Sequence, residues 1–519
     1  MINHIDQQES DIDPTIRYLL NRLDAGKAPI RVKGLRGSAR AFFVSLLFSR
    51  LSRTLILVCP TEKEAKNIHR DLLFFLEEDK VLLFPSWDIV STDMFSFQRD
   101  IELARIEGFC RLIAGEPLVV VLPVAALLQK TLPQQTFSGY MQTIAIGDTL
   151  DRDRLTERLL QGGYIREALV EAKGEFSIRG HVADIFPANL ACPVRIEFIG
   201  DEIESIRNFD PTTQRSTAER IDFILPPARE ILLTEEAQNM ALRNLRARAG
   251  EIGLAKGIRD RLIDKIGSHL ISSVNPIYFS LFYETDEESD RLFSYFPEDA
   301  LLVQDDESAI ERVLEDLENE YSRFLLKARG EERFYVEQEA VFVSAESFRE
   351  SLHGLPRVII DTLTIGTGSD DVPVFVGTSD LDIPKVLRPG PQAEAGILAP
   401  VAEKIQAWLR QGYAVTLACA GGEEMHRLAH LFASYGLNIQ QAPGGRPFLL
   451  DLQKPVGQPL LVLREGRISS GFQDDAFRQV LIAETDILGK KIPRRHIRPA
   501  REGYFLRSFG ELRGGDYVV

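Results

Sequence analysis

The feature that most constrains the fold is the alternation of apolar and helical segments in the first quarter of the chain. Residues 55–59 (LILVC) and 118–121 (LVVV) are continuous apolar runs, which are typical of strands buried on both faces of a parallel sheet. Shorter apolar segments at 30–32 and 81–84 repeat the pattern, and helical segments separate all four. This alternation predicts a doubly wound, parallel α/β domain.

Residues 32–41 have the outline of a phosphate-binding loop, G-x-x-x-x-G-K-[ST], that follows a strand and opens a helix. In a working loop the glycines let backbone N–H groups contact phosphates, the lysine reaches the terminal phosphates and the hydroxyl holds Mg²⁺. Here Gly34 keeps the first glycine, but Ala39, Arg40 and Ala41 occupy the other three positions. A methyl group cannot ligate magnesium, and an arginine fork differs from the compact charge of lysine. We therefore interpret the loop as a degenerate, RecA-like remnant that serves as a structural turn. The alternative is residual anion binding at the helix N-terminus by the remaining candidates, Gly34, Gly37, Ser38 and Arg40.

Length, charge and cysteine spacing restrict the class of protein. A chain of 519 residues predicts several domains. A net charge of −16 argues against broad non-specific DNA binding, because phosphate neutralisation needs clustered Lys and Arg. The four cysteines are far apart, which predicts reduced intracellular thiols and no zinc site. No apolar run approaches the ~20 residues that span a bilayer, and the polar N-terminus is unlike a targeting peptide, so we expect a cytoplasmic protein without membrane contact.

The pattern of apolar and polar residues changes after about residue 130, where short strand-like segments follow one another. Residues 136–148 alternate with period two, 152–161 have the pattern of a short helix, and 176–180, 194–198 and 202–207 read as strands. We expect a small inserted α+β domain here and a second, smaller α/β domain near the C-terminus. The predicted division is 1–128 (first part of the helicase-like α/β domain), 129–226 (insertion), 227–383 (second part), 384–392 (linker), 393–488 (small α/β domain), 489–509 (basic linker) and 510–519 (start of a further domain).

Three stretches carry a family resemblance. They are 163–187 (GYIREALVEAKGEFSIRGHVADIFP), 195–215 (RIEFIGDEIESIRNFDPTTQR) and 296–303 (FPEDALLV). They resemble the nucleotide-excision-repair protein UvrB and, more closely, the UvrB-like front half of the bacterial transcription-repair coupling factors. Residues 466–472 (GRISSGF) and 484–491 (ETDILGKK) resemble the coupling factors alone.

The resemblance implies partners and a binding surface. In the UvrB pattern, the arginines that fall on Arg166 and Arg179 belong to the surface that meets UvrA, and Phe186 is an apolar neighbour that could equally be core. A third arginine of that pattern is replaced by Ser177. Arginine is common at interface hot spots because its planar fork makes bidentate pairs. The alternative is that both arginines are merely solvated.

Two departures from UvrB argue against catalysis in this chain. The acidic strand end reads Asp305-Asp306-Glu307-Ser308, so the spacing of a DEAD-like box is disturbed, and an acid without a loop to hold nucleotide has nothing to coordinate. Residues 84–105 also leave no room for the long aromatic hairpin with which UvrB clamps DNA. We expect no catalytic residue and no cofactor here.

The resemblance places the motor, with its ATP and Mg²⁺ and most of the DNA contacts, in a C-terminal half beyond residue 519. It also implies that the RNA polymerase β subunit is contacted by the domain that begins near 510. On this basis the chain is expected to be truncated.

Three other patterns carry little weight. His426 and His430 are four residues apart on a predicted helix, but no further ligand is evident and we expect no metal site. Gly366-Thr367-Gly368 lacks a strand-to-helix frame. The basic segment 489–501 (GKKIPRRHIRPAR) can contact DNA, contact the acidic body of its own chain, or simply be solvated.

The leading hypothesis is a non-catalytic module that recruits UvrA to RNA polymerase stalled at a DNA lesion. An alternative is an ATP-binding helicase-class or UvrB-type DNA-damage enzyme, in which Arg40 replaces the lysine and Asp305 and Asp306 hold magnesium. A third role, compatible with the first, is restraint of the motor in the full-length protein.

Overall fold

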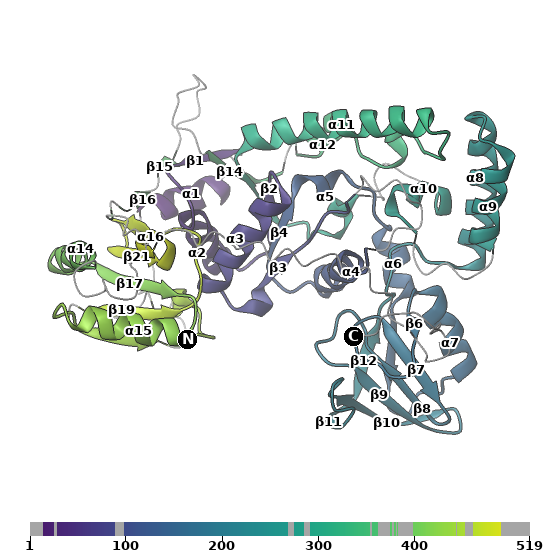
Figure 1. Cartoon of the computed structure of the whole chain (residues 1–519), viewed down its shortest axis with the longest axis horizontal. Coiled ribbons are helices and arrows are strands. Elements are labelled where there is room, and N and C mark those ends of the chain that lie inside the picture. The colour runs from purple at the N-terminus through teal and green to yellow at the C-terminus, as the bar shows by residue number, and fades with distance from the viewer. Residues whose placement is uncertain are drawn as a thin grey trace, which may run out of the picture.

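The computed structural model describes residues 14–24, 29–88, 98–267, 274–284, 291–352, 355–361, 374–375, 378–379, 381, 383, 398–442, 444–451 and 460–488. In this part of the chain, three sheets of six or seven strands organise the molecule, and a two-stranded ribbon joins two of them. Figure 1 shows the largest sheet in the middle, the inserted sheet below it on the right and the small C-terminal sheet on the left.

The central sheet has seven strands, and every neighbouring pair is parallel. Its order is β15 (Val374–Phe375), β1 (Ile30–Lys33), β14 (Arg357–Asp361), β13 (Leu301–Asp305), β2 (Leu55–Cys59), β4 (Val119–Pro123) and β3 (Val81–Leu83). The prediction of a parallel α/β sheet is therefore confirmed. β13 and β14 lie between β1 and β2, so the chain returns after the insertion to complete the middle of the sheet.

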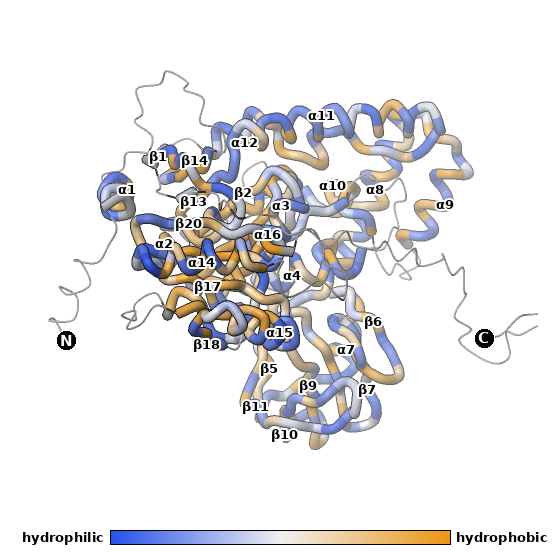
Figure 2. The backbone as a smooth tube through the Cα atoms, turned by 60° about the vertical axis from the view of Figure 1, so that its left-hand side comes forward, coloured by the Kyte–Doolittle hydropathy of each residue, from blue (hydrophilic) through white to orange (hydrophobic). Residues whose placement is uncertain are grey.

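Helices cover both faces of this sheet, and the apolar side chains of the strands divide between two large cores. Figure 2 shows the resulting orange interior beneath blue outer helix faces. The helices of this domain are α1 (Pro14–Asp24), α2 (Ala39–Leu51), α3 (Glu62–Phe75), α4 (Arg99–Ala114), α5 (Val124–Leu128), α11 (Glu307–Gly330) and α12 (Ala345–Leu352), with a short 3₁₀ turn, η2 (Glu78–Lys80).

The inserted domain is a six-stranded sheet with a helix, α7 (Arg152–Gln161), packed near its edge. Its order is β11 (Ser216–Arg220), β10 (Glu202–Phe209), β9 (Val194–Ile199), β8 (Val182–Ile185), β7 (Glu175–Arg179) and β6 (Ile165–Arg166). The ribbon of β5 (Gln142–Ala145) and β12 (Asp222–Leu225) joins it to the central domain. The period-two prediction for 136–148 is wrong in its first part, because α6 (Gln134–Tyr140) buries Phe137 from a helix before β5 begins.

The predicted helical stretch after the insertion consists of two helices. α8 (Glu235–Glu251) and α9 (Lys256–Gly267) are separated at Gly253, whose φ of 65° breaks the helix. They form the hairpin at the right of Figure 1. Short elements follow: η3 (Pro276–Tyr278), α10 (Phe279–Phe282), η4 (Leu292–Tyr295) and η5 (Gln338–Ala340).

The small C-terminal domain has a mixed sheet with its own core. Its order is β16 (Thr378–Ser379), β20 (Phe472–Asp474), β21 (Gln479–Ala483), β17 (Ala414–Cys419), β19 (Leu461–Glu465) and β18 (Ile439–Ala442). Its helices are α14 (Ala399–Arg410), α15 (Gly422–Ala433), η6 (Phe448–Asp451) and α16 (Glu484–Leu488).

Several predictions concern segments outside the described residues, namely the linker 384–392, the glycine loop 366–368 and the C-terminal segments 489–509 and 510–519. Among the helices that the structure does describe, none has the length and apolarity to cross a bilayer. All four cysteines are free thiols, as the sequence predicted.

Candidate functional site

The degenerate phosphate loop is filled by an ion pair from its own domain. Arg40, in the first turn of α2, places Nη1 2.5 Å from Oδ2 of Asp305 at the end of β13. Arg40 Nε also donates to the Gly37 carbonyl oxygen, at 3.3 Å. Burial raises the pKa of the Asp305 carboxyl, and the charge of Arg40 opposes that rise. The arginine that replaces the lysine therefore points at the acid that would stand near magnesium.

The second acid of the predicted pair caps a helix. Asp306 adopts a left-handed conformation with φ of 64°, and its Oδ1 accepts a hydrogen bond at 3.0 Å from the N–H of Ala309 in the first turn of α11. The following residue, Glu307, pairs with Arg31 of β1 at 2.6 Å. Asp305 thus ties α2 to the sheet, Asp306 caps α11, and Glu307 ties α11 to β1.

The loop also forms part of the surface on which a turn of the small C-terminal domain packs. Ser38 is fully buried, and its Oγ donates to the carbonyl oxygen of Ser470. A Cβ atom at Gly37, which has φ of 50°, would lie 1.7 Å from Ser470 Oγ, so glycine is needed here for close approach. Thr378 Oγ1 donates to the Gly34 carbonyl oxygen at 2.8 Å from another side.

The contact surface extends along α3, where Asp71 accepts two hydrogen bonds from one residue of the same turn. Ser469 donates from its N–H to Oδ1 at 2.7 Å and from its Oγ to Oδ2 at 2.5 Å. Burial raises the pKa of Asp71 to about 6, although both hydrogen bonds oppose the rise. At Gly466 a Cβ atom would lie 2.5 Å from the Phe74 ring. The 466–472 motif therefore docks the small domain on the central one.

Aromatic rings complete this interface. Phe42 of α2 lies 5.4 Å, centroid to centroid, from Phe472 of β20, and Phe74 stacks on Phe448 of η6 at 5.6 Å. These rings belong to a single apolar core that spans both domains. Edge and offset pairs of this kind add to the free energy of apolar burial.

What remains beside the loop is a small cavity of about 230 Å³, lined by Gly34, Ala39, Thr378 and Phe472 among others. Ligand pockets are usually larger, roughly 300–1,000 Å³. The arrangement thus favours the structural interpretation of the loop.

On the inserted domain, Arg179 is held by a buried carboxylate. Its Nη2 donates to Asp184 Oδ2 at 2.9 Å, while half of the arginine side chain stays exposed. Arg195 donates twice to the same carboxylate, at 2.7 and 3.0 Å, and stacks over Phe209. The hydrogen bonds to Asp184 raise the pKa of Arg195. A cationic, oriented guanidinium is thereby presented at the surface by Arg179.

Arg166 is exposed and lines a hollow of about 660 Å³ between β6, α7 and α8. β6 is the edge strand, and Arg166 pairs with Phe176 of β7 in parallel register. Because side chains alternate along a strand, Arg166 shares the face of Phe176, whereas Arg179, three residues further on, belongs to the opposite face. The two arginines therefore flank the same sheet edge without sharing a face.

The two neighbouring positions of this pattern are buried. Phe186 is 7% exposed and packs with Val170 and Phe209 in a small core. This placement favours the core alternative over a partner contact. Ser177, which replaces the third arginine, is also buried, and its Oγ donates to the Ala168 carbonyl oxygen at 3.3 Å.

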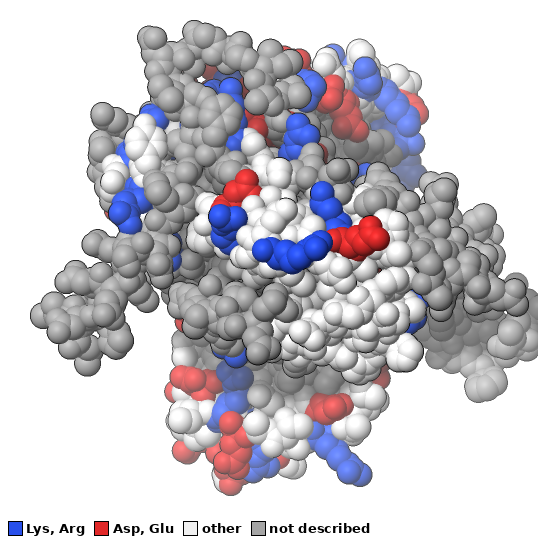
Figure 3. Space-filling model, turned by 90° about the vertical axis from the view of Figure 1, so that its left-hand side faces the viewer, with Lys and Arg blue, Asp and Glu red and all other residues white. Residues whose placement is uncertain are grey.

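The histidine pair and the surface charge can be described only where the structure covers them. His426 and His430 are exposed on α15, and the described part of the chain holds no group of three or more His, Cys, Asp or Glu that could bind a metal ion. On the face shown in Figure 3, Lys and Arg are interspersed with Asp and Glu or with uncharged surface, without a continuous basic stripe over the described residues.

Sequence reasoning missed the residues that orient and cover these sites. Asp184 gave a usable signal, since a lone acid in the apolar strand 182–185 needs a cationic partner. Ser469 and Ser470 gave none, because their partners, Asp71 and Ser38, lie about 400 residues away in the sequence.

Comparison with known proteins agrees with this description. Residues 143–231 match the family of the UvrB interaction domain. The matched residues include the whole inserted sheet and nearly all of its two-stranded ribbon.

Along nearly its whole length the chain is similar to transcription-repair-coupling factors. It is 27% identical to that of Bacillus subtilis (strain 168) over 99% of this chain and 42% of the relative, and 29% identical to that of Myxococcus xanthus over 96% and 42%. The factor of Staphylococcus aureus (strain USA300) is 22% identical over 95% and 41%. The chain is a homologue of the N-terminal region of the transcription-repair-coupling factors. It spans about two fifths of the length of these relatives.

A solved structure of S. tokodaii Xpd4 aligns with 86% of this chain and 78% of its own, at 9% identity and a TM-score of 0.20, which is too weak a similarity to inform the fold.

Proposed function

We propose that the chain is the N-terminal, non-catalytic part of a transcription-repair coupling factor, and that its inserted domain recruits UvrA to RNA polymerase stalled at DNA lesions. The observation that carries the proposal is the match of 143–231 to the UvrB interaction domain, together with the oriented guanidinium of Arg179 and the exposed Arg166 at one sheet edge.

The geometry supports a partner that wraps around the β6 edge. Arg179 is pre-oriented by Asp184, so little side-chain entropy is lost when it binds a carboxylate. Arg166 stands at the hollow of about 660 Å³ on the other face, where a partner side chain could enter. Two arginines on opposite faces of an edge can be contacted together only by a partner that embraces the edge.

The remaining activities of such a factor belong to its other regions. RNA polymerase contact through a domain beginning near residue 510, DNA translocation, and the ATP and Mg²⁺ that drive it are proposed for the full-length protein. The helicase-class alternative is not favoured, because Arg40 pairs with Asp305 and Asp306 caps α11.

The proposal is tested by measuring the affinity of UvrA for this chain with the variants Arg166→Glu, Arg179→Glu and both together. Each single reversal is expected to weaken binding at least about tenfold, as for interface hot spots. Arg215→Glu is the matched control, since Arg215 is an exposed arginine of the same domain near the opposite sheet edge.

Arg179→Glu places a carboxylate beside Asp184 and can weaken the fold. Arg179→Gln avoids that repulsion and is expected to weaken UvrA binding while leaving the thermal unfolding temperature within a few degrees of the parent's. Undiminished UvrA binding by the folded double variant would overturn the proposal.

A further inference from the structure

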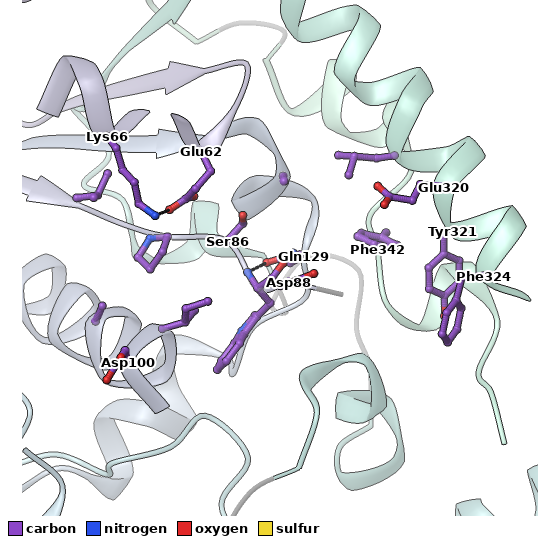
Figure 4. A pocket seen from close by; sticks show the side chains of 17 residues that line it. Glu62, Lys66, Ser86, Asp88, Asp100, Gln129, Glu320, Tyr321, Phe324 and Phe342 are labelled. Carbon is purple, nitrogen blue, oxygen red and sulfur yellow. Dashed lines mark hydrogen bonds and ion pairs between the residues drawn. The ribbon is translucent and has the colours of Figure 1, made fainter. Parts of the chain in front are cut away.

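A mostly apolar cavity of the described structure lies away from both sites discussed above. It has a volume of about 560 Å³, within the roughly 300–1,000 Å³ typical of ligand pockets. Figure 4 shows the opening between the ends of β3 and α5 on one side and α11 on the other. The residues that line it come from α3, α4, α5 and α11 and from the segments after β3 and η5.

One wall of the cavity is aromatic and fixed in place. Tyr321 stacks on Phe324 with centroids 5.3 Å apart and meets Phe342 edge-on at 5.3 Å. The Tyr321 hydroxyl donates to the Val336 carbonyl oxygen at 3.1 Å. These contacts hold the rings before any ligand arrives, so a ligand would not have to order them.

The opposite wall carries Trp87, which is 6% exposed. Its backbone is pinned by Gln129, which accepts from the Trp87 N–H at 2.8 Å and donates to the Trp87 carbonyl oxygen at 2.9 Å. No described residue accepts a hydrogen bond from the buried indole Nε1–H of Trp87. The two backbone hydrogen bonds to Gln129 thus fix Trp87 in the wall of the cavity.

The rim of the cavity is acidic. Asp88, Asp100 and Glu320 line it, and all three are exposed. Glu62 also lines it, beside Lys66, the one basic side chain among the lining residues, and this lysine pairs with Glu62 at 3.2 Å. Figure 4 shows that these carboxylates come from both sides of the opening. The rim thus repels phosphates and attracts cations.

We propose that this cavity binds a peptide segment of a protein partner, in which an apolar side chain is flanked by Lys or Arg. The apolar side chain fills the space between Trp87 and Tyr321, and the basic residues pair with the rim. The two requirements (apolar volume and positive charge) are met together by such a peptide and not by a nucleic acid. The proposal is independent of the UvrA surface.

The chain offers a built-in reporter for this site. It contains two tryptophans, and the second, Trp408, donates to Gln473 within the small C-terminal domain. In the intact chain carrying Trp408→Phe, fluorescence reports on Trp87 alone. The probe is a capped peptide with a Leu-Phe pair between two lysines on each side. A saturable change in Trp87 emission is expected on titration.

Two control peptides and three variants define the mode of binding. Glutamates in place of the lysines, or serines in place of the Leu-Phe pair, should each weaken binding more than tenfold. Asp100→Asn with Glu320→Gln should weaken binding at least fivefold. Glu318→Gln, an exposed neighbour on α11 that does not line the cavity, should leave it unchanged.

Ala125→Leu, which places a larger side chain in the cavity, should abolish the fluorescence response while the chain keeps its unfolding temperature. The proposal is overturned if the basic peptide gives no saturable response, or if the acidic peptide binds equally well. The proposal is also overturned if the substitution Phe95→Ala, without any peptide, produces the change in Trp87 emission that is expected on peptide binding. Residues 89–97 of the chain itself would then be the occupant of the cavity.

Discussion

In the degenerate loop, the positive charge of Arg40 is balanced by a carboxylate of the protein and not by the phosphates of a nucleotide. In a working site the loop lysine faces phosphates and the strand acid faces magnesium. Here Arg40 faces Asp305 directly, at 2.5 Å, so both charges are neutralised without a ligand. The pair is mostly buried, which makes each partner depend on the other.

The first prediction concerns this pair. Arg40→Ala should lower the free energy of unfolding by about 3–5 kcal/mol, because it leaves the Asp305 carboxylate buried without its cation. The double variant Arg40→Met with Asp305→Leu should recover most of that loss, since two apolar side chains need no partner. Urea unfolding measures both. A single variant within about 0.5 kcal/mol of the parent, as for an ordinary surface substitution, would show that the pair is dispensable.

The second prediction concerns pH and Asp71. Burial raises the pKa of Asp71 from 3.8 to about 6 in the folded protein. Its contribution to stability is therefore fully present below about pH 4 and is lost as the pH rises to about 6. Asp71→Asn keeps an acceptor for the Ser469 N–H but removes the titration. The stability of the parent relative to this variant should thus fall between pH 4 and 6. A difference that stays constant with pH would contradict the prediction.

At the scale of elements, the glycines of 466–472 are positions where the docking turn has no room for a side chain. A Cβ atom at Gly466 would meet the Phe74 ring at 2.5 Å, and one at Gly471 would meet the Leu481 carbonyl oxygen at 2.3 Å. Gly466 is therefore constrained by a ring of the central domain, and Gly471 by a strand of its own domain, β21.

The third prediction tests that constraint. Gly466→Ala should loosen the small domain from the central one, which limited proteolysis of the intact chain would detect as faster cleavage. Gly422→Ala is the matched control, because no atom lies within 4 Å of a Cβ atom placed there, and alanine is the better helix former. Equal cleavage rates for the two variants would argue that Gly466 does not control docking.

The sequence predicted those elements whose signal is local. The buried strands at 55–59 and 118–121 were recognisable from continuous apolar runs, and the 152–161 helix from its pattern; α7 has the same bounds. The segment 136–148 was wrong in its first part, because the burial of Phe137 overrides the local period. The contacts that close the degenerate loop could not be predicted, because residues such as Ser469 and Asp71 meet only through the packing of two domains.

At the scale of the whole molecule, the chain combines three bodies with different roles. The central sheet is a frame, the small domain is docked on its degenerate loop, and the inserted sheet presents one arginine on each face near its β6 edge. The turn at 466–472 contacts both the degenerate loop and α3. The degenerate loop is thereby part of the contact between the central and the small domain.

The central claim is that the degenerate loop, closed by its own ion pair and by the small domain, does not bind a nucleotide. Calorimetric titration of the intact chain with Mg-ATP tests it most directly. We predict no saturable heat beyond dilution at nucleotide concentrations up to a few times ~1 mM, which corresponds to a binding free energy weaker than about −4 kcal/mol. A saturable one-to-one isotherm with a dissociation constant well below ~1 mM would contradict the account.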